Sequence, residues 1–143
     1  MGHFLPLAEF VKRLSKFHGF SITFIISKWI WTSQQPAVFQ RLAFSALDIH
    51  FTEIPHITEY EDEQNMKLAT RILKFMLKAK PHIENVLQSL CSSAPVSAFI
   101  TDLFCTELFD VTAKLKMPSY MFVSSSDSFV CFMLHFPKLV SEI

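Results

Sequence analysis

The chain has 143 residues, is 50% hydrophobic and contains 16 Phe, which is enough apolar material for one domain with a real core. Its 13 basic and 13 acidic residues cancel, so no overall field favours nucleic acid or an anionic membrane. No apolar run approaches the ~20 residues that span a bilayer, and the N-terminus lacks the pattern of a secretion signal. We therefore expect a cytoplasmic protein with no nucleic-acid partner and no membrane span.

The cysteine and histidine patterns argue against disulfides and metal. The cysteines, Cys91, Cys105 and Cys131, are odd in number, lack C-x-x-C spacing and lie in apolar stretches. This pattern is typical of reduced, buried thiols in a cytosolic protein. The six histidines show no ligand spacing such as H-E-x-x-H. We therefore predict no disulfide and no metal site.

The chain opens directly on a helix. Pro6 suits a first helical turn, where its absent N–H costs nothing, and Gly19 is typical of the residue that ends a helix. In α/β domains a strand and a glycine-containing turn normally precede such a helix. We therefore expect the chain to begin partway into a βαβ unit, as a fragment without its first strand.

Short strands are predicted next, at residues 21–26 and 49–52, from their β-rich composition. Between them we expect a loop with a helical turn or two near residues 38–42. Residues 59–90 have helical spacing, with acidic residues leading and basic residues following, which suits the helix dipole. Pro81 is expected to kink or split this helix, because proline removes one backbone hydrogen bond.

The last third of the chain continues the alternation. A buried strand is predicted at residues 96–101, an amphipathic helix at 105–114 and a short strand at 120–123. A last helix opens at residues 129–136, and Pro137 is expected to break or bend it. Several aromatic side chains of this part are expected mostly in the core: Phe99, Phe104, Phe122, Phe129 and Phe132.

The order of elements predicts an α/β fold, a Rossmann-like, doubly wound and mostly parallel sheet with strand 1 missing. That strand would be central in the sheet, between strands 2 and 4. Its absence would leave two unpaired strand edges in the core unless strands 2 and 4 close up. Each buried backbone group without a partner costs about 1–3 kcal/mol.

Two side chains stand where such a sheet collects function, at the carboxyl ends of strands. His3 lies in the turn that would follow strand 1, and Asp102 directly follows the strand at residues 96–101. Because strands 1 and 4 are neighbours, the pair could perform general-base catalysis: His3 takes a proton from a hydroxyl, and Asp102 holds its other ring nitrogen. Spacing alone favours the simpler alternative, an exposed His3 and an Asp102 that caps the next helix.

The opening residues 2–14 read GHFLPLAEFVKRL. They resemble the G-H-x-x-P-x-x-x-x-A-K-x-L opening of plant UDP-glycosyltransferases. Residues 134–139, LHFPKL, resemble the L-H-L-P-x-L segment of the branch that glucosylates hydroquinone and other small phenols. The likeness covers nearly the whole chain and is poorest at residues 27–47. Further similar segments occur in order at residues 18–24, 98–104 and 109–111.

This resemblance implies the two-domain GT-B fold, with residues 1–143 as part of the N-terminal, acceptor-binding domain and the donor-binding domain absent. The implied reaction moves a hexose, expected to be glucose, from a UDP-sugar to a hydroxyl of a small phenolic or other secondary metabolite, with inversion. The resemblance makes His3 the catalytic base and Asp102 its partner. It also places sugar contacts on Ser124 and Ser125, unless the serine run is only a turn and N-cap. UDP-sugar is a co-substrate, so no cofactor is expected.

Departures from the family pattern leave other functions open. Family members have a strand before the position of Met1 and a donor-binding domain beyond that of Ile143. The chain has no G-x-G-x-x-G and no P-loop, and its only glycines are Gly2 and Gly19. The alternatives are a non-catalytic module that binds small molecules and a vestigial product of a truncated gene.

Overall fold

The computed structural model describes residues 4–27, 35–58 and 65–141 of the chain. Helices and parallel strands alternate along it, which confirms the predicted α/β class. The elements in chain order are α1 (Phe4–His18), β1 (Ile22–Ile26), α2 (Gln35–Ala43), β2 (Ile49–Glu53), α4 (Leu68–Ser93), β3 (Phe99–Thr101), the 3₁₀ helix η1 (Leu103–Leu108), α5 (Phe109–Lys114), β4 (Ser119–Met121) and α6 (Asp127–Ser141).

The strands form two separate parallel pairs. β1 pairs with β2 from Ile22↔Ile49 to Ile26↔Glu53, and β3 pairs with β4 from Phe99↔Ser119 to Thr101↔Met121. Within the described residues no ladder joins one pair to the other. β1 and β3, which the predicted sheet places on either side of its first strand, are not paired with each other in the described residues.

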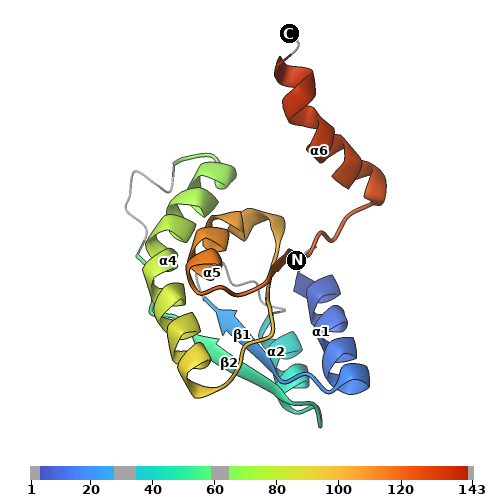
Figure 1. The fold of residues 1–143 in the computed structure, drawn as a ribbon, viewed down its shortest axis with the longest axis vertical. Coiled ribbons are helices and arrows are strands. Elements are labelled where there is room, and N and C mark those ends of the chain that lie inside the picture. The colour runs from blue at the N-terminus through green and yellow to red at the C-terminus, as the bar shows by residue number, and fades with distance from the viewer. Residues whose placement is uncertain (1–3, 28–34, 59–64, 142–143) are drawn as a thin grey trace.

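Helix α4 supplies the main core. It packs Phe75, Met76, Ala79, Ile83 and Leu87 against Leu108 and Val111 of the η1–α5 segment. Ile25 of β1 and Phe99 of β3 pack against this same cluster. Figure 1 shows α4 along one side of the molecule, next to α5. One long helix therefore supports both strand pairs from the same face.

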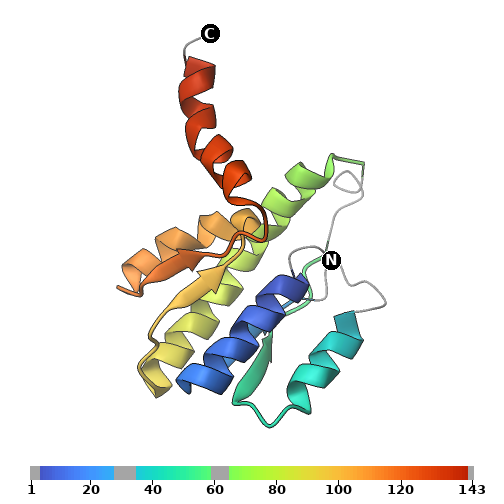
Figure 2. The same cartoon turned by 90° about the vertical axis from the view of Figure 1, so that its right-hand side faces the viewer.

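Helix α1 covers the opposite face and touches both pairs. Its Ala8 joins Leu42 of α2 and Ile49 of β2 in a second, smaller core cluster. Figure 2 shows α1 in front of the strands, between the two pairs. The helix ends as predicted at Gly19, whose φ of 67° is left-handed and whose N–H donates to the Ser15 carbonyl at 3.1 Å.

Two predictions of helix bounds need correction. The stretch before β2 contains a helix of nine residues, α2, where only a turn or two was expected. Packing of Leu42 into the second cluster gives this short helix a tertiary partner that its weak periodicity did not reveal. The long helix begins at Leu68, and the acidic residues expected to lead it lie in 59–64, outside the described residues.

Of the two outcomes expected at each proline, a split and a bend, the split does not occur. Pro81 lies inside the continuous α4, and Pro137 inside the continuous α6. Pro81 removes the partner of the Leu77 carbonyl, but both residues lie on the exposed side of α4, where water can serve that carbonyl. Tertiary packing on the other side of α4 holds the two halves in one helix.

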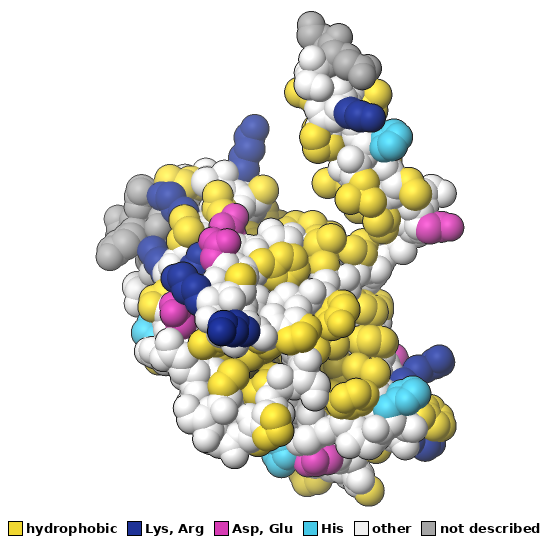
Figure 3. All heavy atoms as spheres, viewed as in Figure 1, with side chains coloured by type: hydrophobic (Ala, Val, Ile, Leu, Met, Phe, Trp, Pro, Cys, Tyr) yellow, Lys and Arg dark blue, Asp and Glu magenta, His cyan; other side chains and the backbone are white. Residues whose placement is uncertain are grey.

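Helix α6 is apolar but has no buried residue. It projects away from the rest of the molecule in Figures 1 and 2, and Figure 3 shows hydrophobic side chains along it. The prediction of core positions was therefore wrong for Phe129 and Phe132, which are 40% and 50% exposed, and Phe104 of η1 is 42% exposed. No helix in the described part of the chain is long and apolar enough to cross a membrane.

The prediction of buried thiols also fails for two cysteines. Cys91 and Cys131 are exposed, because Cys91 lies on the outer side near the end of α4 and Cys131 lies on α6. Cys105 of η1 is partly buried and contacts the α4 core. Apolar neighbours in sequence therefore did not identify which face of each helix a cysteine occupies.

Candidate functional site

The candidate site lies where β3 and β4 end. The last ladder pair is Thr101↔Met121, and the Phe122 N–H continues it by donating to the Thr101 carbonyl at 2.7 Å. Asp102 and Ser124 leave the paired region at this same edge, one residue after Thr101 and two after Phe122. The structure thus brings two predicted site positions to the carboxyl ends of adjacent parallel strands, as a doubly wound fold requires.

Asp102 caps the helix that follows it. Its backbone is extended, with φ −84° and ψ 178°, and its Oδ1 accepts the Phe104 N–H at 2.9 Å. This is the capping role that spacing alone favoured. A carboxylate has about four lone-pair sites, so a cap that uses one of them leaves acceptor capacity for a second donor.

Cys105 is a neighbour of Asp102 that the motif comparison did not single out. Burial, followed by the negative charge of Asp102, raises the pKa of its thiol from 9.0 to about 12. Its Sγ lies 3.7 Å from Sδ of Met76 on α4. The thiol is therefore protonated at neutral pH, unsuited to act as a nucleophile, and forms part of the wall between Asp102 and the core.

The serine turn after β4 consists of Ser124, Ser125 and Ser126. Ser126 caps α6, since its Oγ accepts the Phe129 N–H at 3.3 Å and its carbonyl accepts the Val130 N–H. The capping alternative therefore holds for Ser126 of this serine run. Ser124 is half-buried and Ser125 is exposed.

His3 lies outside the described residues, so its distance to Asp102 is not part of this geometry. The helix that directly follows His3, α1, contacts the end of the β3–β4 pair. Phe10 of α1 stacks on Phe122 with ring centroids 5.2 Å apart. Figure 2 shows the N-terminal end of α1 and the start of α6 toward the same end of the strand pairs.

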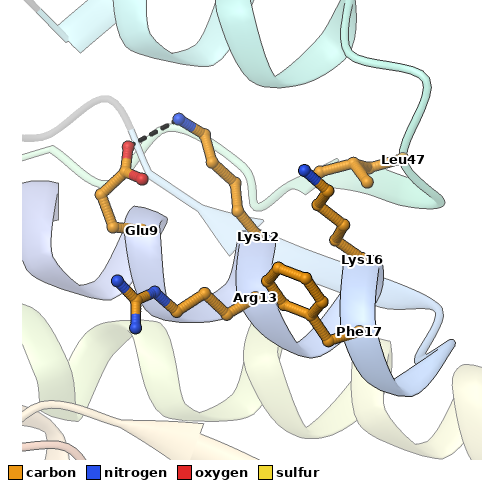
Figure 4. A pocket seen from close by; sticks show the side chains of 6 residues that line it. All are labelled: Glu9, Lys12, Arg13, Lys16, Phe17 and Leu47. Carbon is orange, nitrogen blue, oxygen red and sulfur yellow. Dashed lines mark hydrogen bonds and ion pairs between the residues drawn. The ribbon is translucent and has the colours of Figure 1, made fainter.

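A pocket of about 250 Å³ lies elsewhere, on the outer side of α1. Figure 4 shows its lining side chains, which are Glu9, Lys12, Arg13, Lys16, Phe17 and Leu47. Nζ of Lys12 lies 2.6 Å from Oε1 of Glu9, and the Lys16 ammonium lies over the Phe17 ring at 5.4 Å. These contacts are typical of a solvated helix face, and none of the predicted site residues lines this pocket.

Known proteins resemble the chain over nearly its whole length. UDP-glycosyltransferase 72B1 of Arabidopsis thaliana is 30% identical over 142 residues, and hydroquinone glucosyltransferase of Rauvolfia serpentina is 29% identical over 141 residues. Each alignment covers 97% of this chain. The predicted resemblance to plant UDP-glycosyltransferases is confirmed. No protein-family model matches the chain.

Solved plant UDP-glycosyltransferases share the fold. UGT2 of Phytolacca americana without ligand superposes with a TM-score of 0.87 at 28% identity, over the whole of this chain. The same protein with UDP-2-fluoro-glucose and pterostilbene gives 0.85 at 30% identity. The predicted match to the GT-B fold is therefore confirmed.

The match covers only part of each UDP-glycosyltransferase. This chain spans 29% of the length of both curated relatives, and 31% and 32% of the two solved chains.

Proposed function

We propose that this chain supplies the acceptor side of a UDP-sugar-dependent glycosyl transfer, with a small phenol as acceptor and glucose as the sugar. The single observation that carries this proposal is the position of Asp102 at the carboxyl end of β3, with its carboxylate held by the Phe104 N–H. Relatives named as glucosyltransferases, hydroquinone glucosyltransferase among them, support the reaction class.

In the proposed reaction, a ring nitrogen of His3 takes the proton from the acceptor hydroxyl as its oxygen attacks the anomeric carbon. The bond from that carbon to the UDP oxygen breaks, UDP leaves with the electron pair, and the configuration inverts. Asp102 accepts a hydrogen bond from the other ring nitrogen and stabilises the imidazolium. Ser124 and Ser125 would direct hydroxyl groups toward the sugar from the end of β4.

A UDP-sugar would be held by a donor-binding domain of the kind that the resemblance implies. The parts described here contribute a rigid acceptor side: a capped carboxylate, a protonated thiol beside it, and α1 fixed across both strand pairs. A residue held by a cap keeps its orientation at little further entropic cost, which favours a positioning role for Asp102.

Binding by the chain itself is the first test. Hydroquinone is titrated into the isotope-labelled chain while backbone amide shifts are followed. Saturable shifts at Asp102, Phe104 and Ser124 are expected, and shifts confined to the α1 pocket, monitored at Lys16, would contradict the proposed acceptor site. Phenol, which lacks the second, para hydroxyl of hydroquinone, serves as the matched control ligand.

Transfer is the second test, in the longest protein that the transcript encodes. With UDP-glucose and hydroquinone, His3→Ala and Asp102→Asn are expected to lower kcat by about 10²- to 10⁴-fold, because general-base catalysis typically contributes that much. Cys105→Ala, close to Asp102 but outside the proposed chemistry, should retain most of the activity. Saturable binding without transfer in the wild-type protein would instead support the non-catalytic binding module.

A further inference from the structure

The pocket on the outer side of α1 has a local excess of positive charge. Three of its six lining side chains are cationic and one, Glu9, is acidic, in a chain whose charges cancel overall. Its volume of about 250 Å³ is below the ~300–1,000 Å³ of pockets that hold drug-sized ligands. A ligand for this pocket is therefore small, with a single ring, and carries a negative charge.

The three cations of the pocket differ in what already holds them. Nζ of Lys12 pairs with Oε1 of Glu9 at 2.6 Å. The Lys16 ammonium lies 5.4 Å from the centroid of the Phe17 ring, in the last turn of α1, where the negative end of the helix dipole favours a cation. Arg13 has neither kind of contact, and within the part of the chain that the structure describes its guanidinium forms no ion pair or hydrogen bond. Its N–H donors are therefore available to a ligand.

Phe17 and Leu47 give the same pocket an apolar side. The Phe17 ring is 68% exposed, so much of its surface is open to a ligand. Leu47 is half-buried and packs against the second, smaller core cluster, and its carbonyl accepts the Ile49 N–H at 2.9 Å. Figure 4 shows Leu47 on the segment across from α1. The core therefore holds this side of the pocket in place before any ligand binds.

We propose that the α1 pocket binds a small aromatic carboxylate, with one ring and one acidic group. The planar guanidinium of Arg13 matches a carboxylate through two parallel N–H···O bonds, which an alcohol cannot form. Arg13 and Phe17 are four residues apart on α1 and are neighbours on its surface, so one molecule reaches both. The ring of that molecule lies against Phe17 and Leu47 and covers apolar surface that the fold leaves exposed.

This site is separate from the one at the ends of β3 and β4 and does not depend on the proposed function. A neutral phenol lacks the charge that Arg13 recognises, so an acceptor such as hydroquinone is not a ligand for this pocket. Because Arg13, Lys16 and Phe17 are all exposed, water competes for each contact. We therefore expect a Kd for the carboxylate on the order of 1 mM at low salt.

The test is a titration of the whole, isotope-labelled chain with benzoate, followed by NMR at the backbone amides and at the Arg13 Nε–H. Saturable shifts are expected at Arg13, Phe17 and Leu47. Benzyl alcohol has the same ring without the charge, and acetate has the carboxylate without the ring. Each of these control ligands should bind at least about tenfold more weakly than benzoate, because each makes only one of the two contacts.

A matched set of variants locates the contact at one side chain. Arg13→Gln should weaken benzoate binding about tenfold, because it removes the charged fork. Arg41→Gln removes the same charge from an exposed arginine of α2 that does not line the pocket, and should bind as the wild type does. Arg13→Lys keeps the charge but loses the paired donors, so its affinity should lie between those of Arg13→Gln and the wild type.

Four results would overturn the proposal. The first is benzyl alcohol or acetate binding as tightly as benzoate. The second is equal benzoate affinity of Arg13→Gln and the wild type, and the third is an equal loss in Arg13→Gln and Arg41→Gln. The fourth is benzoate shifts confined to Asp102 and Ser124, which would place the ligand at the ends of β3 and β4 instead. Sugar transfer is not measured here, so a failure of this proposal leaves the proposed function to its own tests.

Discussion

Phe10 of α1 and Phe122 after β4 stack with their ring centroids 5.2 Å apart and their planes 25° from parallel. Phe122 also donates its N–H to Thr101, so the ring that α1 contacts belongs to the last bonded residue of the β3–β4 pair. At the N-terminus of α1, the ring centroid of Phe4 lies 6.4 Å from that of Phe24 of β1. Since no described ladder joins the two strand pairs, this helix and α4 hold them together.

Removing the stacked ring should therefore loosen the connection between the pairs. Phe10→Ala is expected to lower the free energy of unfolding by about 2 kcal/mol, less than for a fully buried Phe because both rings are half-buried. Phe17→Ala on the same helix is the control, since that ring is 68% exposed and its loss should cost less than about 0.5 kcal/mol. Urea unfolding of both variants measures the difference, and equal losses would contradict the bridging role of Phe10.

Two substitutions should separate the helix-capping role of Asp102 from the role of its charge. Asp102→Ala is expected to cost about 1 kcal/mol of stability, because the Phe104 N–H loses its acceptor. Asp102→Asn keeps an acceptor oxygen and caps helices about as well, so its cost should be a few tenths of a kcal/mol. Thermal unfolding compares them, and an Asn variant as unstable as the Ala variant would show that the carboxylate charge, and not the cap, supports the fold.

The Cys105 thiol predicts a loss of stability at alkaline pH. The folded chain keeps this thiol protonated up to about pH 12, whereas the ordinary thiol pKa is 9.0. Below pH 9 the thiol is protonated in both states and adds no pH dependence. As pH rises from 9 toward 12, the unfolded chain releases the proton first, so the free energy of unfolding falls.

Urea unfolding between about pH 8 and pH 11 tests this dependence, with Cys105→Ala as the variant that should lose this part of the slope. A thiol reagent at neutral pH gives a second readout. The exposed Cys91 and Cys131 should react rapidly and Cys105 only after unfolding. Rapid reaction of all three in the folded chain would contradict the assigned burial.

The sequence predicted strands β1 and β2 better than α2, the helix between them. β1 and β2 lie within one residue of the expected ranges, because β-branched runs bounded by turn residues are strong local signals. Helix α2 was underestimated because its order depends on Leu42, which is fully buried against α1 and β2 through contacts distant in sequence. Local periodicity carries no information on such contacts.

The site was predictable in position but not in detail. Asp102 stands at the end of β3 as expected, because the strand signal and the following polar residue are both local. The proximity of Cys105 to Met76 joins residues 29 positions apart, and no spacing rule indicates it. The role of Ser126 in capping α6 depends on where that helix begins, and helix ends are the feature that a sequence pattern predicts least well.

Two left-handed residues in the described part of the chain give a final pair of opposite predictions. Gly19 ends α1 at φ 67°, and a Cβ built there would have nothing within 4 Å, so Gly19→Ala should cost about 1 kcal/mol through the backbone alone. Lys116 after α5 has φ 53° and donates its N–H to the Ala113 carbonyl at 3.0 Å. Lys116→Gly removes the clash of its Cβ and should raise stability by up to about 1 kcal/mol, partly offset by the greater entropy of the unfolded chain. Thermal unfolding of the two single variants should therefore shift in opposite directions. Gly19→Asn, which tolerates this conformation better than Ala, should lie between Gly19→Ala and the wild type, and a shift as large as that of Ala would contradict a purely conformational cause.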